Sequence, residues 1–351
     1  MKEENRHTTA DKESESPNRR ALDYLLRWGL PLCLTLLLVW YMFRKVNFSE
    51  MLAILSAGVD YWWILGAMGL SVFSHIFRAM RWRIQLRSLG IHASLGALCC
   101  SIFGCYSLNL IFPRLGEVWR CTFISRREKA RFTTVLGSMV GDRLCDTLMV
   151  LMLTLLAFLL AAPAIESFMA KYPVGQGILS LLGNIWAWLA FFVGILLVWG
   201  LFRYGKELWI VSKIRGWVKE LWSGFAALWR MKGKWCFLAL TIAIWGCYFL
   251  QLYLAFFAFG FTRQLCEEGS LGFGLLPCLV AFVVSSMGMA IPSNGGLGPW
   301  NIAIIFGLGL YGIGEAEGTA FSMLVWSAQT VMLIILGIYT MIYISKKKEK
   351  R

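Results

Sequence analysis

Charged residues are scarce in this chain. Only 15% of its 351 residues are Asp, Glu, Lys or Arg, whereas a soluble domain carries about 25%. Hydrophobic residues make up 58%, the mean hydropathy is +0.64, and the apolar residues form long blocks rather than amphipathic stripes. This composition excludes an ordinary soluble enzyme and predicts an all-α, polytopic helical membrane protein.

Motifs of metal, redox and nucleotide chemistry are also lacking. The histidines His7, His75 and His92 have no metal-ligand spacing, and none of the ten cysteines forms a CxxC pair. There is no Ser/His/Asp or Cys/His arrangement and no Walker or Rossmann glycine pattern. We therefore predict no catalytic residue, no metal and no cofactor, which favours a role other than an enzyme.

The formal net charge of +14 could indicate nucleic-acid binding, but its distribution argues against that. The basic residues flank apolar runs instead of forming one patch. Cytoplasmic loops that contact anionic lipid headgroups account for this pattern. We therefore expect anionic lipids, and no nucleic acid, at these loops; the sequence does not specify the oligomeric state.

The sequence predicts a disordered cytoplasmic tail (1–22), a single transmembrane domain (23–345) and a basic cytoplasmic C-terminus (346–351). Hydropathy predicts about six to eight transmembrane helices, together with two re-entrant or broken segments at about 94–113 and 271–310. The simple spans are expected at about 26–43, 60–77, 132–161, 184–202, 235–260 and 318–344.

Basic loops orient these spans through the positive-inside rule and predict that both termini are cytoplasmic, in a bacterial inner (plasma) membrane. If 94–113 were a full span, the basic segment 114–131 would lie outside, against the rule. A re-entrant hairpin that returns to the cytoplasmic side resolves this conflict. The basic residues assigned to the cytoplasmic loop after the second span are Arg78, Arg81, Arg83 and Arg87.

The segment 271–310 must leave the outer face and return to it. It could do so as two full spans or as a re-entrant hairpin broken near Pro292. Two broken hydrophobic segments, one in each half, are typical of transporters and predict a central site.

The first charged cluster follows the apolar run that ends at Pro113. Pro113 suits the first position of a helix, in which Glu117 would pair with Arg114 or Arg120 at i,i+3 spacing. The other arginine would then be free to meet a phosphate, which a planar guanidinium fits well. An ordinary ion ladder at the membrane interface is the alternative.

The second cluster lies inside an apolar helical run. Asp142 and Asp146 share a helix face at i,i+4, and Arg143 reaches Asp146 at i,i+3. Charge at membrane depth costs about 2.5–3.5 kcal/mol per residue, so such groups are usually paired and functional. The acids could orient Arg114 or Arg120, or clamp two helices together.

The third cluster is a glycine-rich stretch before an apolar half-helix over 299–310. Ser293 or Asn294 could cap this helix, and Pro299 fits its first turn. Backbone N–H groups at a helix start favour an anion; a tightly packed helix break is the alternative. The candidate binding residues in this cluster are Asn294, Gly295, Gly296, Gly298 and Asn301.

Together, the stretches PRLGEVWR, GDRLCD and PSNGGLG resemble the flippase-like membrane family, that of the lysylphosphatidylglycerol synthetase transmembrane region, over about residues 25–345. The family pattern is similar to P-x-R-x-G-E-x-x-R, an acidic-Arg-x-x-Asp helix and P-x-x-G-G-x-G-x-x-E. Here Pro113 and Arg114 are adjacent, and Asn301 stands where the family usually has Glu, so hydrogen bonding carries over to this position but acid/base chemistry does not.

The resemblance implies movement of a phospholipid or a polyprenyl-phosphate-linked lipid. Because the sequence ends at Lys346–Arg351, we expect a stand-alone member without the soluble aminoacyltransferase domain of the bifunctional members. In this interpretation arginines contact the phosphate, acids position them, and the glycine turn adds backbone donors. The headgroup-binding set is Arg114, Glu117, Arg120, Asp142, Arg143, Asp146, Asn294, Gly295, Gly296, Gly298 and Asn301.

Two rival functions remain open from the sequence. A membrane-embedded transferase in lipid or lipid-linked glycan synthesis would need a general base, for which Glu117 and Asp142 are the candidates. A secondary transporter of small anions would use the same cationic side chains.

Overall fold

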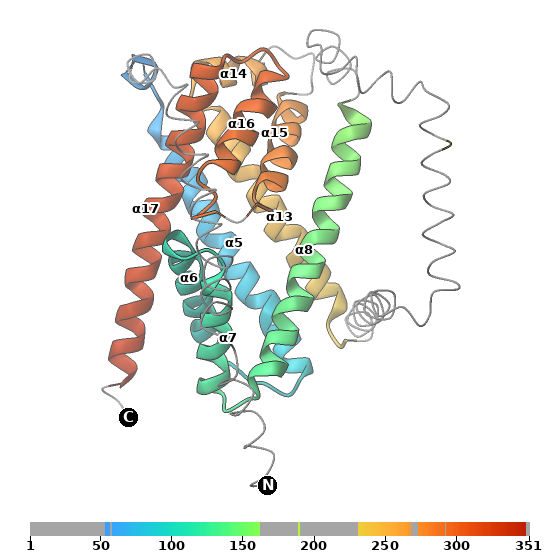
Figure 1. Ribbon diagram of the computed structural model, residues 1–351, viewed down its shortest axis with the longest axis vertical. Helices are drawn as coiled ribbons and strands as arrows, with labels where there is room; N and C mark the ends of the chain where they lie inside the picture. Colours follow the sequence, from blue (N-terminus) through green and yellow to red (C-terminus); the bar gives the residue numbers. More distant parts are fainter. Residues whose placement is uncertain are drawn as a thin grey trace, which may run out of the picture.

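A computed structural model shows that the protein is a bundle of long and short helices (Figure 1). The described residues contain no strand, and they are 53–56, 58–161, 189, 231–267, 273–291 and 293–348. The tail 1–22, the span predicted at about 26–43, nearly all of the span predicted at about 184–202, and Pro292 lie outside these residues.

Four helices are long and apolar enough to cross a membrane. They confirm the spans predicted near 60–77, 132–161, 235–260 and 318–344. Asp60 begins the first of them by accepting a hydrogen bond from the backbone N–H of Trp62 at 3.2 Å. The four helices are α5 (Tyr61–Ser88), α8 (Phe132–Leu160), α13 (Lys234–Phe256) and α17 (Glu315–Lys348).

Shorter helices form two antiparallel hairpins, one for each segment predicted to be broken. The first joins α6 (Leu95–Ile111) to α7 (Leu115–Arg127), and the second joins α15 (Leu275–Gly288) to α16 (Pro299–Gly309). With 17 residues, α6 is the longest of the four; at 1.5 Å per residue it measures about 26 Å, less than the roughly 30 Å of a bilayer core. The structure thus favours hairpins over pairs of full spans.

Glycines let the two arms of each hairpin approach closely. A Cβ on Gly116 of α7 would collide with the backbone carbonyl of Cys105 in α6, and one on Gly288 of α15 would lie 2.7 Å from the carbonyl oxygen of Pro299. Real side chains do not tolerate such contacts, so glycine fixes the spacing of both hairpins.

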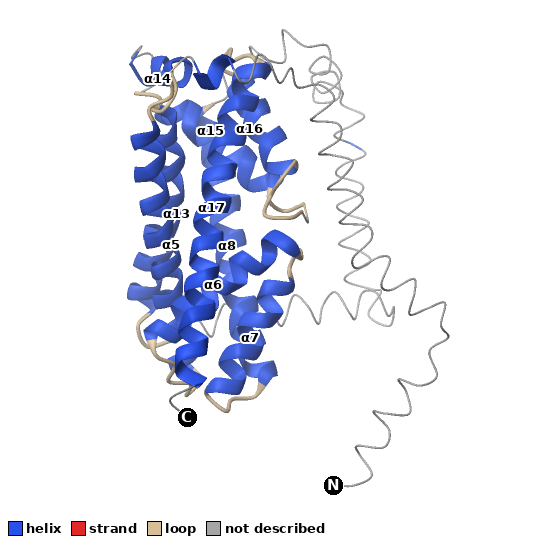
Figure 2. Ribbon diagram, turned by 90° about the vertical axis from the view of Figure 1, so that its left-hand side faces the viewer, coloured by secondary structure: helices blue, strands red, loops and turns tan. Residues whose placement is uncertain are grey.

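The hairpins lie at opposite ends of the bundle, and their tips face each other (Figures 1 and 2). The backbone N–H of Gly295 donates to the Asn109 carbonyl at 3.2 Å, and the Asn294 amide donates to the Ile111 carbonyl at 3.3 Å. The first and third sequence clusters are therefore in direct contact, although they lie about 180 positions apart.

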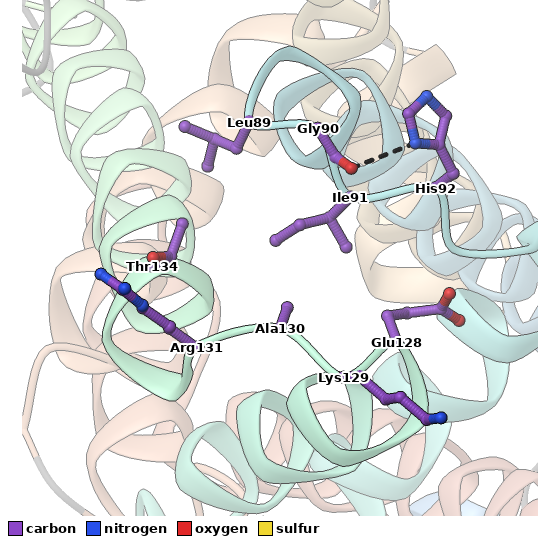
Figure 3. Close-up of a pocket in the computed structure, with 9 residues that line it drawn as sticks. All are labelled: Leu89, Gly90, Ile91, His92, Glu128, Lys129, Ala130, Arg131 and Thr134. Carbon is purple, nitrogen blue, oxygen red and sulfur yellow. Dashed lines mark hydrogen bonds between the residues drawn. The ribbon is translucent and has the colours of Figure 1, made fainter.

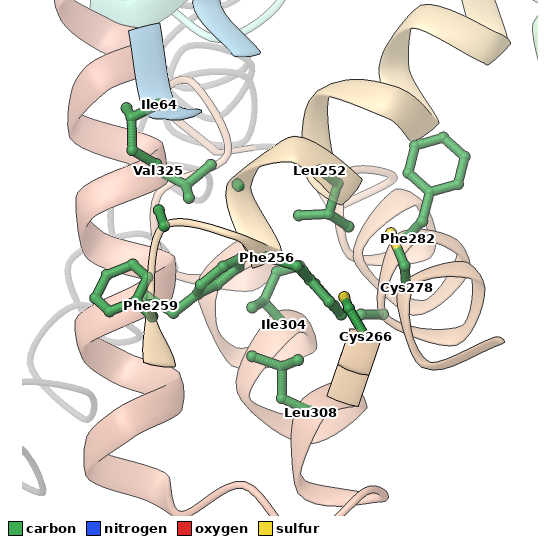
Figure 4. Close-up of a cluster of buried hydrophobic side chains, with 14 residues drawn as sticks. Ile64, Leu252, Phe256, Phe259, Cys266, Cys278, Phe282, Ile304, Leu308 and Val325 are labelled. Atoms are coloured by element: carbon green, nitrogen blue, oxygen red, sulfur yellow. The ribbon is translucent and has the colours of Figure 1, made fainter. Parts of the chain in front are cut away.

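Each hairpin packs into its own apolar core. Around α15 and α16 the core includes Phe256, Ile304 and Phe321, and the short helix α14 (Gly260–Glu267) closes it at the end of the bundle (Figure 4). Around α6 and α7 the core includes Trp82 and Ile124. Burial of these side chains holds the hairpins in place without a continuous span in either.

The two ends of the bundle differ in charge. The end near the α7–α8 connection is mainly basic, and the opposite end carries most of the remaining acids. The residues at the basic end include Arg87, Arg126, Lys129, Arg131, Lys232 and Lys346, with the acid Glu128; those at the acidic end are Asp60, Glu267, Glu315 and Glu317, with the base Arg263.

Candidate functional site

Two aspartates of α8 meet two arginines of α5 in the interior of the bundle. Asp146 accepts hydrogen bonds from Arg78 at 2.7 Å and from Arg81 at 2.8 Å. Asp142 lies 2.6 Å from Arg81 and 3.4 Å from Arg78. All four side chains are buried. Because removing one partner would leave an uncompensated buried charge, these four residues form one electrostatic unit.

This arrangement corrects the prediction that Arg78 and Arg81 belong to a cytoplasmic loop. The helix α5 continues to Ser88, and both guanidinium groups lie inside the protein. A signal for them was present in the sequence, since polar residues recur every three or four positions along α5. The buried members of this stripe are Ser71, Ser74, His75, Arg78, Arg81 and Gln85.

Arg120 of α7 extends the unit from the other side. Its guanidinium lies over the Trp82 ring, 4.7 Å from the centroid, and 3.9 Å from the Asp142 carboxylate. The side chain is fully buried, and none of its three nitrogens has a hydrogen-bond acceptor among the residues that the structure describes. The interior therefore holds a cation that is paired only loosely.

Glu117 pairs with Arg143 of α8, at 3.0 Å, rather than with Arg114 or Arg120 as predicted. The i,i+3 geometry is overridden because α8 packs against α7 and brings Arg143 to the carboxylate. Arg143 also lies 3.9 Å from Asp146, as its spacing predicted. Asn109 donates to Glu117 at 3.2 Å and accepts from the Gly116 N–H at 2.8 Å. This pair is the accessible edge of the network, since the Arg143 side chain is 36% exposed.

Arg114 lies in the turn at the hairpin tip. Its backbone is left-handed (φ 65°), and α7 begins at the next residue, so Pro113 is part of the turn and is not the first helical residue. Among the described residues, the exposed Arg114 side chain makes only a long hydrogen bond, 3.5 Å, to the carbonyl of Ala290. A guanidinium is thus presented where the two hairpins meet.

The glycine stretch forms the opposing tip. Gly295, Gly296 and Gly298 all have positive φ. Gly298, and not Ser293 or Asn294, caps α16, and its N–H donates to Asn301 at 3.1 Å; Pro299 takes the first helical position as predicted. Two backbone N–H groups that could have met an anion, those of Gly295 and Gly298, therefore already have protein acceptors.

A second polar group lies farther along α5 on the same side as Arg78. Ser71 exchanges hydrogen bonds with Gln329 of α17, which accepts from Gln251 of α13 at 2.8 Å. Arg78 itself donates to the Tyr248 hydroxyl at 3.2 Å. These neutral side chains were not predicted, because single polar residues in apolar runs carry little signal.

A cavity of about 470 Å³ lies away from this network, between the α5–α6 and α7–α8 connections (Figure 3). It holds none of the predicted site residues. Its basic side chains, Lys129 and Arg131, are exposed at the basic end of the bundle, where anionic lipid headgroups were expected.

The interior network carries more positive than negative charge. Four guanidinium groups surround three carboxylates, so one positive charge is left over. Among the described residues, no group of three or more His, Cys, Asp and Glu side chains could hold a metal ion.

One family model matches most of the chain. Its description is "Lysylphosphatidylglycerol synthase TM region", and it covers residues 28–337. No curated protein and no solved structure matches the chain significantly.

Proposed function

Because the chain belongs to the family of the lysylphosphatidylglycerol synthase transmembrane region, we propose that it binds a phosphate-bearing lipid headgroup and helps that headgroup to cross the membrane. A membrane protein with a lipid-related role follows from the family. The observation that carries the finer proposal is the arginine-rich network buried beside the tips of the two hairpins.

The headgroup first meets the network at its accessible edge. Arg114 is exposed, and the ion pairs of Arg143 with described residues are one with Glu117 and a longer one with Asp146. A phosphate can replace the Glu117 carboxylate on Arg143, because a guanidinium binds either group through two parallel hydrogen bonds. The Arg78, Arg81, Asp142 and Asp146 unit behind this edge is neutral and stays intact, and Arg120 beside it supplies the remaining positive charge.

Movement past the hairpin tips completes the crossing. Among the described residues, the tips at 109–114 and 290–295 are joined by one backbone hydrogen bond, one from the Asn294 amide, one long arginine contact and the packing of Leu110 against Gly295. Each hairpin, in contrast, has its own apolar core. The tips can therefore separate while the cores stay intact. Such discontinuous helices around a central site are a recurring arrangement in transporters.

The charge asymmetry of the bundle supports an orientation. The positive-inside rule places the end with Arg126, Lys129 and Arg131 in the cytoplasm. The α6–α7 hairpin then opens to the cytoplasm and the α15–α16 hairpin to the outer side of a bacterial inner membrane, with the C-terminal end of α17 inside.

Transport accounts for the site better than a transferase does. Glu117 and Asp142, the two candidate bases, already contact Arg143 and Arg81 at 3.0 Å and 2.6 Å. A transporter of small anions would use the same arginines. A lipid substrate, unlike a small anion, must enter the site from the bilayer, and hairpins that end within the membrane provide such an entrance.

A lipid-scrambling assay tests the proposal. Liposomes that contain the purified protein and a trace of fluorescent phosphatidylglycerol are treated with dithionite, which bleaches only the outer leaflet. We expect Arg114→Gln and Arg143→Gln each to slow the movement about tenfold, equivalent to roughly 1.4 kcal/mol. The control Arg126→Gln removes an exposed charge at the basic end and should have no effect. Equal rates of lipid movement in the unmodified protein and in all three variants would exclude the proposed mechanism.

A further inference from the structure

We infer that the site selects an anionic headgroup and rejects one that carries an added amino group, such as an aminoacylated phosphatidylglycerol. This inference rests on the proposed function. The lipid expected for this chain is therefore an unmodified anionic phospholipid or another phosphate-linked lipid without an ammonium group.

A cationic headgroup would need a carboxylate that is free to receive it. Among the described residues, only Glu117, Asp142 and Asp146 carry a carboxylate away from the two ends of the bundle. The other described acids lie at helix ends or in the connections between helices, and they are Asp60, Glu128, Glu267, Glu315 and Glu317.

All six oxygens of these three interior carboxylates already have partners. Asp146 uses one oxygen for Arg78 and the other for Arg81. One oxygen of Asp142 lies 3.4 Å from Arg78, and the other lies 2.6 Å from Arg81. The shorter contact is an ion pair whose geometry is not that of a hydrogen bond. Glu117 uses one oxygen for Arg143 and the other for the Asn109 amide. An ammonium group that entered would have to break one of these contacts while facing an excess of guanidinium groups.

The unpartnered interior atoms of the network point to the opposite class of ligand. They are mostly N–H donors, namely the three guanidinium nitrogens of Arg120 and the Nε atoms of Arg78 and Arg81. Buried hydrogen-bond donors favour a ligand that is rich in hydrogen-bond acceptors and has no positively charged donor group. A phosphate diester supplies such acceptors, and its single negative charge balances the one positive charge left over in the network.

Neutral hydrogen-bonding groups accompany the cations. Gln251, Gln329 and Ser71 form a half-buried to buried chain of amides and a hydroxyl from three helices. Such groups suit the hydroxyls of a glycerol or sugar headgroup. They offer no charge that would favour an ammonium group.

Native mass spectrometry of the purified full chain measures this preference directly. The detergent-solubilised protein is incubated with equal amounts of phosphatidylglycerol and lysylphosphatidylglycerol that have the same acyl chains. We expect the anionic lipid to be retained about tenfold more than the lysylated one. Retention at equal levels, or in favour of the lysylated lipid, would overturn the inference.

The net positive charge of the chain could itself enrich anionic lipids, so matched variants are needed. Arg143→Gln frees one oxygen of Glu117, and Arg126→Gln removes the same charge from the basic surface. The retention ratio should fall at least threefold in Arg143→Gln and stay unchanged in Arg126→Gln. An equal fall in both variants would show that the preference belongs to the surface and would overturn the assignment.

Binding and movement can fail separately. If phosphatidylglycerol is preferred in binding but is not scrambled by the reconstituted protein, translocation is wrong and the selectivity of the site stands. If lysylphosphatidylglycerol is both retained and scrambled better, translocation stands and the inferred selectivity is wrong.

Discussion

The guanidinium of Arg78 lies 2.7 Å from the carboxylate of Asp146, across 68 positions of sequence, with both side chains inside the bundle. This contact joins a polar stripe of α5 to a charged motif of α8. It turns two groups that would each be costly at membrane depth into one shared unit. The rest of the candidate site is built around that unit.

Removal of one partner should destabilise the protein strongly. In Asp146→Asn, both Arg78 and Arg81 lose an anionic partner, and we expect the free energy of unfolding to fall by about 3–5 kcal/mol, the usual cost of breaking a buried ion pair. Thermal unfolding of the detergent-solubilised protein, followed by size-exclusion chromatography, measures the change. The double variant Asp146→Asn/Arg78→Met should recover part of the loss, relative to the sum of the two single variants. Strictly additive effects of the two substitutions would contradict the coupling.

The close contact of α6 with α7 should make Gly116 intolerant of a side chain. A Cβ there meets the Cys105 carbonyl and lies 2.7 Å from the Asn109 side-chain oxygen. Gly116→Ala should therefore lower stability by about 1–3 kcal/mol, as overpacking does. Gly137→Ala in α8 is the matched control, since nothing lies within 4 Å of its Cβ. It should be neutral or slightly stabilising, and a similar loss in both variants would argue against the packed hairpin.

A covalent link between the hairpin tips should stop lipid movement. In a background without the native cysteines, Ile111→Cys and Asn294→Cys place two thiols across the contact in which the Asn294 amide reaches the Ile111 carbonyl. A short cleavable cross-linker should join them, slow scrambling to the rate of protein-free liposomes, and allow recovery after cleavage. A fully cross-linked protein that scrambles at the normal rate would show that the tips do not need to part.

The hairpin topology can be read from thiol labelling in whole cells. His92 and Lys129 border the same cavity (Figure 3), so single cysteines at these positions should both be labelled only when the cytoplasmic side is exposed. A cysteine at Glu315, at the start of α17, should be labelled by an impermeant maleimide from outside. Labelling of His92→Cys and Lys129→Cys from opposite sides would mean that α6 and α7 do not form a re-entrant hairpin.

Much of the fold follows from hydropathy and loop charge. A basic segment after a short apolar run predicts the return of the chain, and the α6–α7 hairpin confirms that prediction. The glycine-rich stretch likewise ends at a helix that begins with Pro299. Both signals are local, because charge, proline and glycine restrict the backbone or the membrane position of the residues that carry them.

The partners within the site could not be predicted in the same way. The i,i+3 rule offered Glu117 two arginines on its own helix, but packing of α8 brings Arg143 to it instead. Arg78 and Arg81 resembled loop residues because hydropathy falls where charges begin, although α5 continues beyond them. Tertiary contacts between helices decide such pairings, and one sequence does not contain them explicitly.

The position of a bound lipid headgroup tests the central claim most directly. An experimental structure of the full chain in nanodiscs that contain phosphatidylglycerol should show a phosphate within hydrogen-bond reach, about 2.7–2.9 Å, of Arg143 or Arg114. In that structure Arg78 and Arg81 should keep Asp142 and Asp146 as partners. Headgroup density confined to the cavity between Leu89–His92 and Glu128–Thr134, with the Arg143–Glu117 pair intact, would contradict the account.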